Sequence, residues 1–158
     1  MHIQRTTGLK WVRALCFVLL IGGCAPLISE YSLDAYKNAT SLKAETLALI
    51  DKSGEKFSAH RPEVDALTIK IDSAFEFAAG IPNNQVSAAQ WQVLRNPEGN
   101  LYGGFVRTWS GSKQGILSPA YRAGKRKEIS DAFDKIICLE VNKKDAKNCE
   151  AAVAATNQ

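Results

Sequence analysis

Histidine is scarce in this chain. Only His2 and His60 occur among the 158 residues, so a histidine-rich metal site or a Ser-His-Asp triad has little material to form from. His60 stands in a charged stretch before a proline, and neither Gly-x-Ser-x-Gly nor His-Glu-x-x-His occurs near it. We therefore predict that His60 is solvated, that the protein is not an enzyme, and that it holds no metal.

Strand signals are also missing. The sequence has no run of alternating β-branched residues bounded by hairpin turns. It has no internal repeat at the periods of roughly 20 to 50 residues that build solenoids. These absences exclude a sheet protein and a repeat array, and they predict an all-α fold.

The first 24 residues lack acids and lack a run long enough to span a membrane. The first acid is Glu30, and Arg5, Lys10 and Arg13 precede an apolar run over 14–21. That run is much shorter than the roughly 20 residues of a spanning helix. A cationic start before a short apolar run is typical of a secretory signal. An uncleaved N-terminal anchor is the alternative.

The end of this segment, Ile21-Gly22-Gly23-Cys24, resembles the lipobox of bacterial lipoproteins. The resemblance implies a signal helix over 1–23, cleavage between Gly23 and Cys24, and a diacylglycerol thioether and further acyl chains such as palmitate on Cys24. Two or three such chains anchor a protein to a membrane almost permanently. Because Ala25 rather than an aspartate follows Cys24, the resemblance implies that the protein is exported to the periplasmic face of the outer membrane.

Removal of residues 1–23 would change the length and the net charge of the mature chain. It leaves 135 of the 158 residues, which we divide into a lipidated tether over 24–29 and a single helical domain over 30–158. Three of the 20 basic residues leave and all 16 acids stay, so the formal charge falls from +4 to +1. A nearly neutral domain gives no support to nucleic-acid binding.

Few cysteines remain after processing. Cys16 leaves with the signal and Cys24 carries lipid, so Cys138 and Cys149 are the remaining pair. In an oxidising compartment such a pair suggests a disulfide, which would add about 3 kcal/mol of stability; two free thiols are the alternative. A zinc site made from this pair and His60 would lack any Cys-x-x-Cys element. The lipid is thus the only non-protein group we expect.

Helical periodicity predicts a small bundle of three long helices with short helices between them. Ser29 is the expected cap of the first long helix, Pro62 starts the second and Ser118-Pro119 starts the third. Gly54 is expected to end the first helix as a left-handed cap, and Gly80 and Val141 are the expected ends of the other two. A capping box at Ser87 and an irregular stretch over 101–109 predict the short helices. The apolar side of the first helix is expected to begin at Tyr31.

The segment 91–109 combines aromatic residues with flexible backbone, and it allows two interpretations. The residues are Trp91, Tyr102, Phe105 and Trp109, with Gly103 and Gly104 among them. Exposed, the aromatics would form a recognition surface. Buried, they would fill the open end of the bundle while the glycines let two backbones approach closely.

The densest basic cluster consists of Arg122, Lys125, Arg126 and Lys127, and several acids follow it. It predicts either a solvated, ion-paired face or a surface that contacts anionic lipid headgroups or an acidic partner. Elsewhere, Asp72 and Glu76 are four residues apart and could share a helix face. A glycosidase would need two such carboxyls across a cleft; solvated surface acids are the alternative.

These observations predict a non-enzymatic lipoprotein that binds an envelope protein as an accessory factor. Two alternatives stay open. One is an enzyme or ligand carrier that acts on cell-wall or lipid material through Asp72, Glu76 or the segment 91–109. The other is an inhibitor or immunity-type binder.

Overall fold

The computed structural model describes residues 29–143 and Cys149. Five helices occur there, and no strand does. They are α2 (Leu33–Lys52), α3 (Phe57–Gly80), α4 (Gln85–Arg95), α5 (Tyr102–Gly111) and α6 (Pro119–Val141). The all-α prediction is therefore confirmed. The predicted signal helix, the cleavage site at Gly23 and Cys24, and most of the tether lie outside the described residues.

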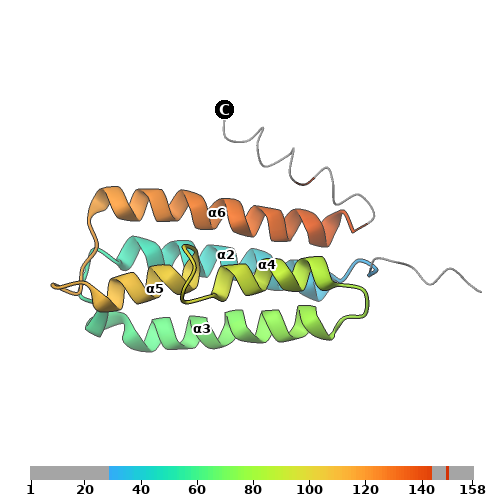
Figure 1. Cartoon of the computed structure of the whole chain (residues 1–158), viewed down its shortest axis with the longest axis horizontal. Helices are drawn as coiled ribbons and strands as arrows, with labels where there is room; N and C mark the ends of the chain where they lie inside the picture. Colours follow the sequence, from blue (N-terminus) through green and yellow to red (C-terminus); the bar gives the residue numbers. More distant parts are fainter. Residues whose placement is uncertain (1–28, 144–148, 150–158) are drawn as a thin grey trace, which may run out of the picture.

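The helices form an up-and-down bundle (Figure 1). The three long helices α2, α3 and α6 match the three that periodicity predicts. The short helices α4 and α5 follow one another end to end and together make the fourth rod. Helix α2 packs on α3 and α6, and α4 packs on the same two helices from the other side.

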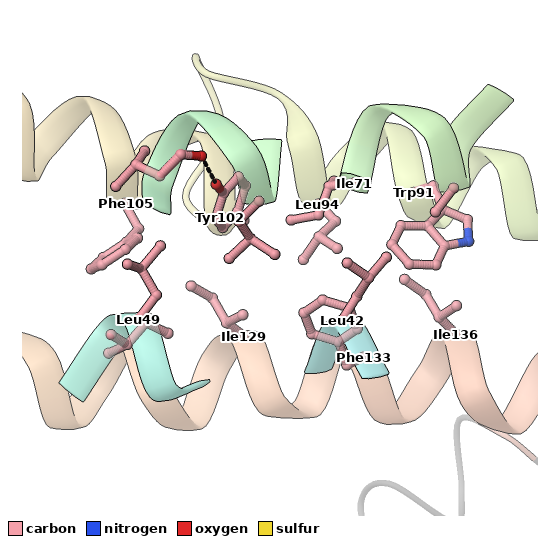
Figure 2. Packing of buried hydrophobic residues seen from close by; sticks show 14 of the residues in the cluster. Leu42, Leu49, Ile71, Trp91, Leu94, Tyr102, Phe105, Ile129, Phe133 and Ile136 are labelled. Carbon is pink, nitrogen blue, oxygen red and sulfur yellow. Dashed lines mark hydrogen bonds between the residues drawn. The ribbon is translucent and has the colours of Figure 1, made fainter. Parts of the chain in front are cut away.

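The core lies between these rods (Figure 2). Leu42 and Leu49 of α2 and three side chains of α6 face the side chains of α3, α4 and α5 across it. The large side chains that are fully or almost fully buried include Ile71, Leu94, Ile129, Phe133 and Ile136. The three-four spacing of apolar residues on each helix produces this continuous interior.

Helix α2 begins later than predicted. Its cap is Ser32, whose hydroxyl accepts a hydrogen bond from Ala35 N at 3.2 Å. Ser29 does not cap a helix because its hydroxyl donates to Asn84 Oδ1 at 3.0 Å. Tyr31, predicted on the buried side, is 53% exposed because it precedes the helix. At the other end the cap is Ser53, so the prediction of a left-handed cap at Gly54 is wrong.

Helix α3 begins before the proline that was expected to start it. The helix runs from Phe57, and Pro62 lies inside its second turn. Phe57 is held by its own contacts: its N–H donates to Gly115 O at 2.7 Å and its ring meets Trp109 edge-on at 5.3 Å. These long-range contacts make residues 58–61, which precede the expected start at Pro62, part of the helix.

Helix α4 starts at Gln85 rather than after the predicted cap at Ser87. Ser87 is 2% exposed, and its hydroxyl accepts a hydrogen bond from Lys143 Nζ. The start of α6 agrees with the sequence: the Ser118 hydroxyl accepts from Tyr121 N at 3.3 Å, and proline takes the first helical position.

Cys138 and Cys149 are joined by a disulfide, and their Cα atoms are 5.6 Å apart. Cys138 lies in the last turn of α6, and Cys149 is 2% exposed. The bond therefore holds position 149 against the end of that helix. Residues 144–148, between Lys143 and Cys149, lie outside the described part of the chain.

Candidate functional site

The aromatic segment lies in the core, so it does not form the predicted recognition surface. Trp91, Tyr102, Phe105 and Trp109 are each at most 2% exposed. Trp91 packs edge-on against Phe133 with ring centroids 5.9 Å apart. The packing interpretation is the one the structure shows, because these large rings fill the space where α4 gives way to α5.

Trp109 closes the end of the bundle farthest from Ser29. Its indole N–H donates to Gly115 O at 2.9 Å and to Glu55 O at 3.1 Å. It thereby ties together the loop before α3 and the loop before α6. A buried indole N–H needs such partners.

His60 is not solvated as predicted, because its side chain is only 11% exposed. Its ring lies 5.9 Å from that of Trp109, and its Nε2 is 2.8 Å from Glu55 Oε2. Glu63 lies on its other side, and a hydrogen bond from Lys52 lowers the pKa of that carboxyl.

The basic residues at the start of α6 bind the end of α2. Arg122 donates to Asp51 O at 3.2 Å, and Arg126 donates to Leu47 O at 3.0 Å and to Asp51 Oδ2 at 2.9 Å. Cations favour a helix C-terminus, where carbonyls are unpaired. Lys125, 13% exposed, donates to Asn100 O and Glu128. The ion pairs of this cluster are thus formed within the chain, while its contact with anionic lipid or an acidic partner stays a prediction.

A cleft of about 320 Å³ opens between α3, α4 and the start of α5. Arg95 and Asp72 form an ion pair at 2.9 Å on its wall. The Arg95 guanidinium also lies 3.9 Å from the centre of the Phe75 ring and donates to Gln92 Oε1. Apolar lining comes from residues such as Ile71 and Val106, with Pro97. A cation, an anion and an apolar floor suit a small ligand that carries both charged and apolar groups.

Tyr102 borders the same cleft with its hydroxyl turned inward. The hydroxyl donates to Val64 O at 3.2 Å and lies 2.8 Å from Thr68 Oγ1. Burial raises the pKa of Tyr102 to about 12, and Asp72 and Asp65 contribute in the same direction. Tyr102 is therefore neutral near pH 7 and serves as a hydrogen-bonding group there rather than as a base.

The predicted pair of carboxylates does not meet in this cleft. Asp72 lines it, with 48% of its side chain exposed. Glu76 is exposed and is absent from the lining. Asp72 and Glu76 do lie one helical turn apart on α3, but only Asp72 faces the cleft.

A second concave surface runs between α2 and α3. Its lining encloses about 410 Å³ and includes Asn38, Ser41, Leu42, Glu45, Ile69, Lys70, Ser73, Ala74 and Phe77. Ile69 and Phe77 are 66% and 40% exposed, and they lie eight residues apart on one side of α3. An ion pair of 2.7 Å between Lys70 and Glu45 crosses it at the end away from Ser29. We call this surface the α2–α3 groove.

The α2–α3 groove was not among the predicted surfaces, although the sequence contains a signal for it. The buried side of α3 is formed by Val64, Leu67, Ile71, Ala74 and Ala78. Two further large apolar residues, Ile69 and Phe77, occur outside that set. Apolar residues in excess of what the core needs point to a second, exposed apolar stripe.

A buried polar cluster at the Ser29 end was also missed. Lys143 and Glu140 are 6% and 0% exposed and form an ion pair at 2.8 Å. Lys143 Nζ also donates to Asn84 Oδ1 and to Ser87 Oγ at 3.0 Å. Since the Ser29 hydroxyl donates to the same Asn84 oxygen, the cluster joins Ser29 to the end of α6.

Comparison of the chain with protein-family models, with curated proteins and with solved structures found no match. Within the described residues no set of three metal-binding side chains converges. Over the same part of the chain, no helix has both the length and the apolar character that crossing a bilayer requires. Cys24, the predicted lipidation site, lies outside that part.

Proposed function

We propose that the protein is a lipid-anchored lipoprotein of the bacterial envelope, held at the periplasmic face of the outer membrane, and that it acts through protein contacts. The lipobox ending in Cys24 supports the anchor. One structural observation supports the arrangement most directly: Ser29 is fixed to the end of the bundle, where its N–H donates to Asn83 O at 3.1 Å. A lipid on Cys24 would therefore hold that end near the bilayer.

The anchor is tested by Cys24→Ser. Because the thioether needs the Cys24 sulfur, we expect the variant to lose palmitate labelling and to leave the membrane fraction. The matched control is the double variant Cys138→Ser, Cys149→Ser, which removes the other pair of cysteines and should keep its label. Undiminished labelling of the Cys24→Ser protein would refute the anchor.

For the partner we propose an apolar helix of another envelope protein, bound along the α2–α3 groove. Ile69 and Phe77 are two helical turns apart, with the small residues Ser73 and Ala74 between them. Ridges of this spacing with small residues between them accept the apolar stripe of an amphipathic helix. The groove is rimmed by polar residues, such as Asn38 and Ser41, as in many protein interfaces.

This contact is tested by photocrosslinking in cells, with a photoreactive residue at position 69, 77 or 93. Val93 on α4 is the control because it is 55% exposed but lies outside the groove. We expect the same crosslinked partner from positions 69 and 77 and none from 93, and we expect Ile69→Lys to abolish the crosslink at 77. Equal crosslinking from all three positions, or none, would remove the support for protein contact here. A partner that loses its own activity when bound would give the protein an inhibitor-type role.

A ligand carrier is the second candidate, favoured by the cleft beside Tyr102. The paired Arg95 and Asp72 next to apolar lining could hold a small ligand that carries both charged and apolar groups. The enzyme version of this alternative is supported less, because Glu76 does not join Asp72 in the cleft.

A further inference from the structure

We infer that the end of the bundle at Ser29 is a surface that contacts the bilayer directly, through Tyr31, Leu33, Val86 and Val141. We call these four residues the apolar end. The inference rests on the proposed lipid anchor, and it adds the orientation of the bundle. The long axis of the bundle points away from the membrane plane, and the apolar end lies in the headgroup layer.

The apolar end carries large side chains that the core does not use. Tyr31, Leu33, Val86 and Val141 are 53%, 51%, 60% and 51% exposed. They are half of the eight large hydrophobic residues that are exposed in the described part of the chain. Single exposed apolar residues are ordinary, but a concentration at one end of a bundle marks an interaction surface.

The four residues share an end because of where their elements begin and stop. Leu33 starts α2, with Tyr31 just before it, Val86 is in the first turn of α4, and Val141 ends α6. The contacts of the buried polar cluster hold these termini together, since Lys143 bonds to Asn84 and Ser87 beside the start of α4. In Figure 1 the start of α2, the start of α4 and the end of α6 lie on the same side of the molecule.

The length of the tether brings this end to the bilayer. Four residues separate Cys24 from Ser29, so even a fully extended chain spans only about 17 Å between their Cα atoms. Each headgroup layer is about 5 to 8 Å thick. Because Ser29 is only 7% exposed and is bonded to Asn83 and Asn84, the tether gains no further length by peeling from the bundle.

The chemistry of the apolar end favours lipid through apolar contact rather than through charge. Tyrosine is enriched at membrane interfaces, where its ring is apolar and its hydroxyl stays wet. The exposed acids Glu30 and Asp34 lie at this end, so anionic lipid is not required for the contact. The basic residues Arg122 and Arg126 lie beside the C-terminus of α2, at the opposite end, so they add no positive charge to the apolar end.

The test places one environment-sensitive fluorophore on an introduced cysteine in the full lipidated protein, reconstituted in vesicles of phosphatidylethanolamine and phosphatidylglycerol. With Cys24 acylated and Cys138 bonded to Cys149, the introduced thiol is the one that reacts. Val86→Cys is compared with Val93→Cys. These two positions are seven residues apart on α4, so they share a face and have similar exposure, yet position 93 lies about 10 Å farther from the apolar end.

We expect the probe at position 86 to shift its emission to shorter wavelength and to be quenched by spin-labelled lipid, while the probe at 93 keeps the emission of a probe in water. Shallow contact reaches only about 5 to 10 Å into the interface, so the two positions should differ clearly. If the protein floats with the vesicles but position 86 stays in water, the bilayer contact is refuted and the anchor stands. If both probes shift, the bundle lies on its side and the inference is also refuted. Failure to float overturns the anchor and this inference together.

Discussion

Replacing Gly104 with alanine should destabilise the protein by about 3 kcal/mol or more. A Cβ built on Gly104 would overlap the carbonyl oxygen and carbon of Gly99. The carbonyl belongs to a turn that is itself closed, since Gly99 N donates to Asn96 O at 3.0 Å and Glu98 N donates to Asn96 Oδ1 at 3.0 Å. Because neither the turn nor the helix is free to move away, the clash must displace the start of α5.

Gly103→Ala should act in the same way. Its Cβ would overlap the carbonyl of Arg95 and the backbone of Asn96, where α4 ends. Both glycines therefore serve the close approach of α5 to the turn that precedes it. This approach sets Tyr102 beside Thr68 in the cleft, so loss of the cleft should accompany loss of stability.

Gly124→Ala is the matched control. Gly124 lies inside α6, and nothing is within 4 Å of a Cβ placed there. Alanine should raise the free energy of unfolding by about 0.5 to 1 kcal/mol because it lowers the entropy of the unfolded chain. Urea unfolding followed by circular dichroism measures all three variants. Equal stability of Gly104→Ala and Gly124→Ala would show that the Gly99 carbonyl does not confine α5.

Local signals made the fold largely predictable. Ser118 followed by Pro119 gives a cap and a first-turn proline, both of which act within four residues, and α6 starts there as predicted. The sequence Asn96-Pro97-Glu98-Gly99 is typical of a type I turn, which also depends on local contacts, and Gly99 N donates to Asn96 O at 3.0 Å. The three-four spacing of apolar residues in α2 and α3 predicts most of the buried side chains, because burial of one helix face dominates the energy of a bundle.

Non-local contacts decided the features that the sequence could not predict. Ser29 has the chemistry of a helix cap, but its hydroxyl pairs with Asn84, 55 residues away. Ser87 has the right neighbours for a capping box, but Lys143 takes its hydroxyl, 56 residues away. A polar side chain that has a local and a distant partner available cannot be assigned from spacing alone.

The candidate surfaces also divide into those that local sequence signals indicate and those that only non-local contacts decide. The aromatic segment allowed both burial and exposure, because its composition suits either. Burial of Trp91 and Trp109 depends on where α4 ends and α5 begins along the fourth rod of the bundle. Those positions are set by packing against the other helices. The groove residues Ile69 and Phe77 were present as an unused apolar excess, so a stricter count of core positions would have indicated them.

Lys143→Met should lower the free energy of unfolding by about 3 to 5 kcal/mol. Glu140 is 0% exposed, its partner in an ion pair is Lys143, and its oxygens make no hydrogen bond. Removing the ammonium leaves the carboxylate buried without a compensating charge. It also removes the donor that reaches Asn84 and Ser87, so the end of α6 loses its link to the α3–α4 loop.

The double variant Glu140→Leu, Lys143→Met separates charge from packing. If the penalty is an uncompensated charge, the second substitution should recover most of the stability, since apolar replacements of a buried pair are often neutral or stabilising. Lys70→Met is the control for an exposed pair: Lys70 and Glu45 are 54% and 44% exposed, and the loss should stay below about 1 kcal/mol. A double variant as unstable as Lys143→Met would show instead that the hydrogen bonds to Asn84 and Ser87 hold this end together. In either case buried polar contacts fill the interior of the end that carries Ser29. The apolar side chains of that end therefore lie on the surface, where the tether from Cys24 would bring them to lipid.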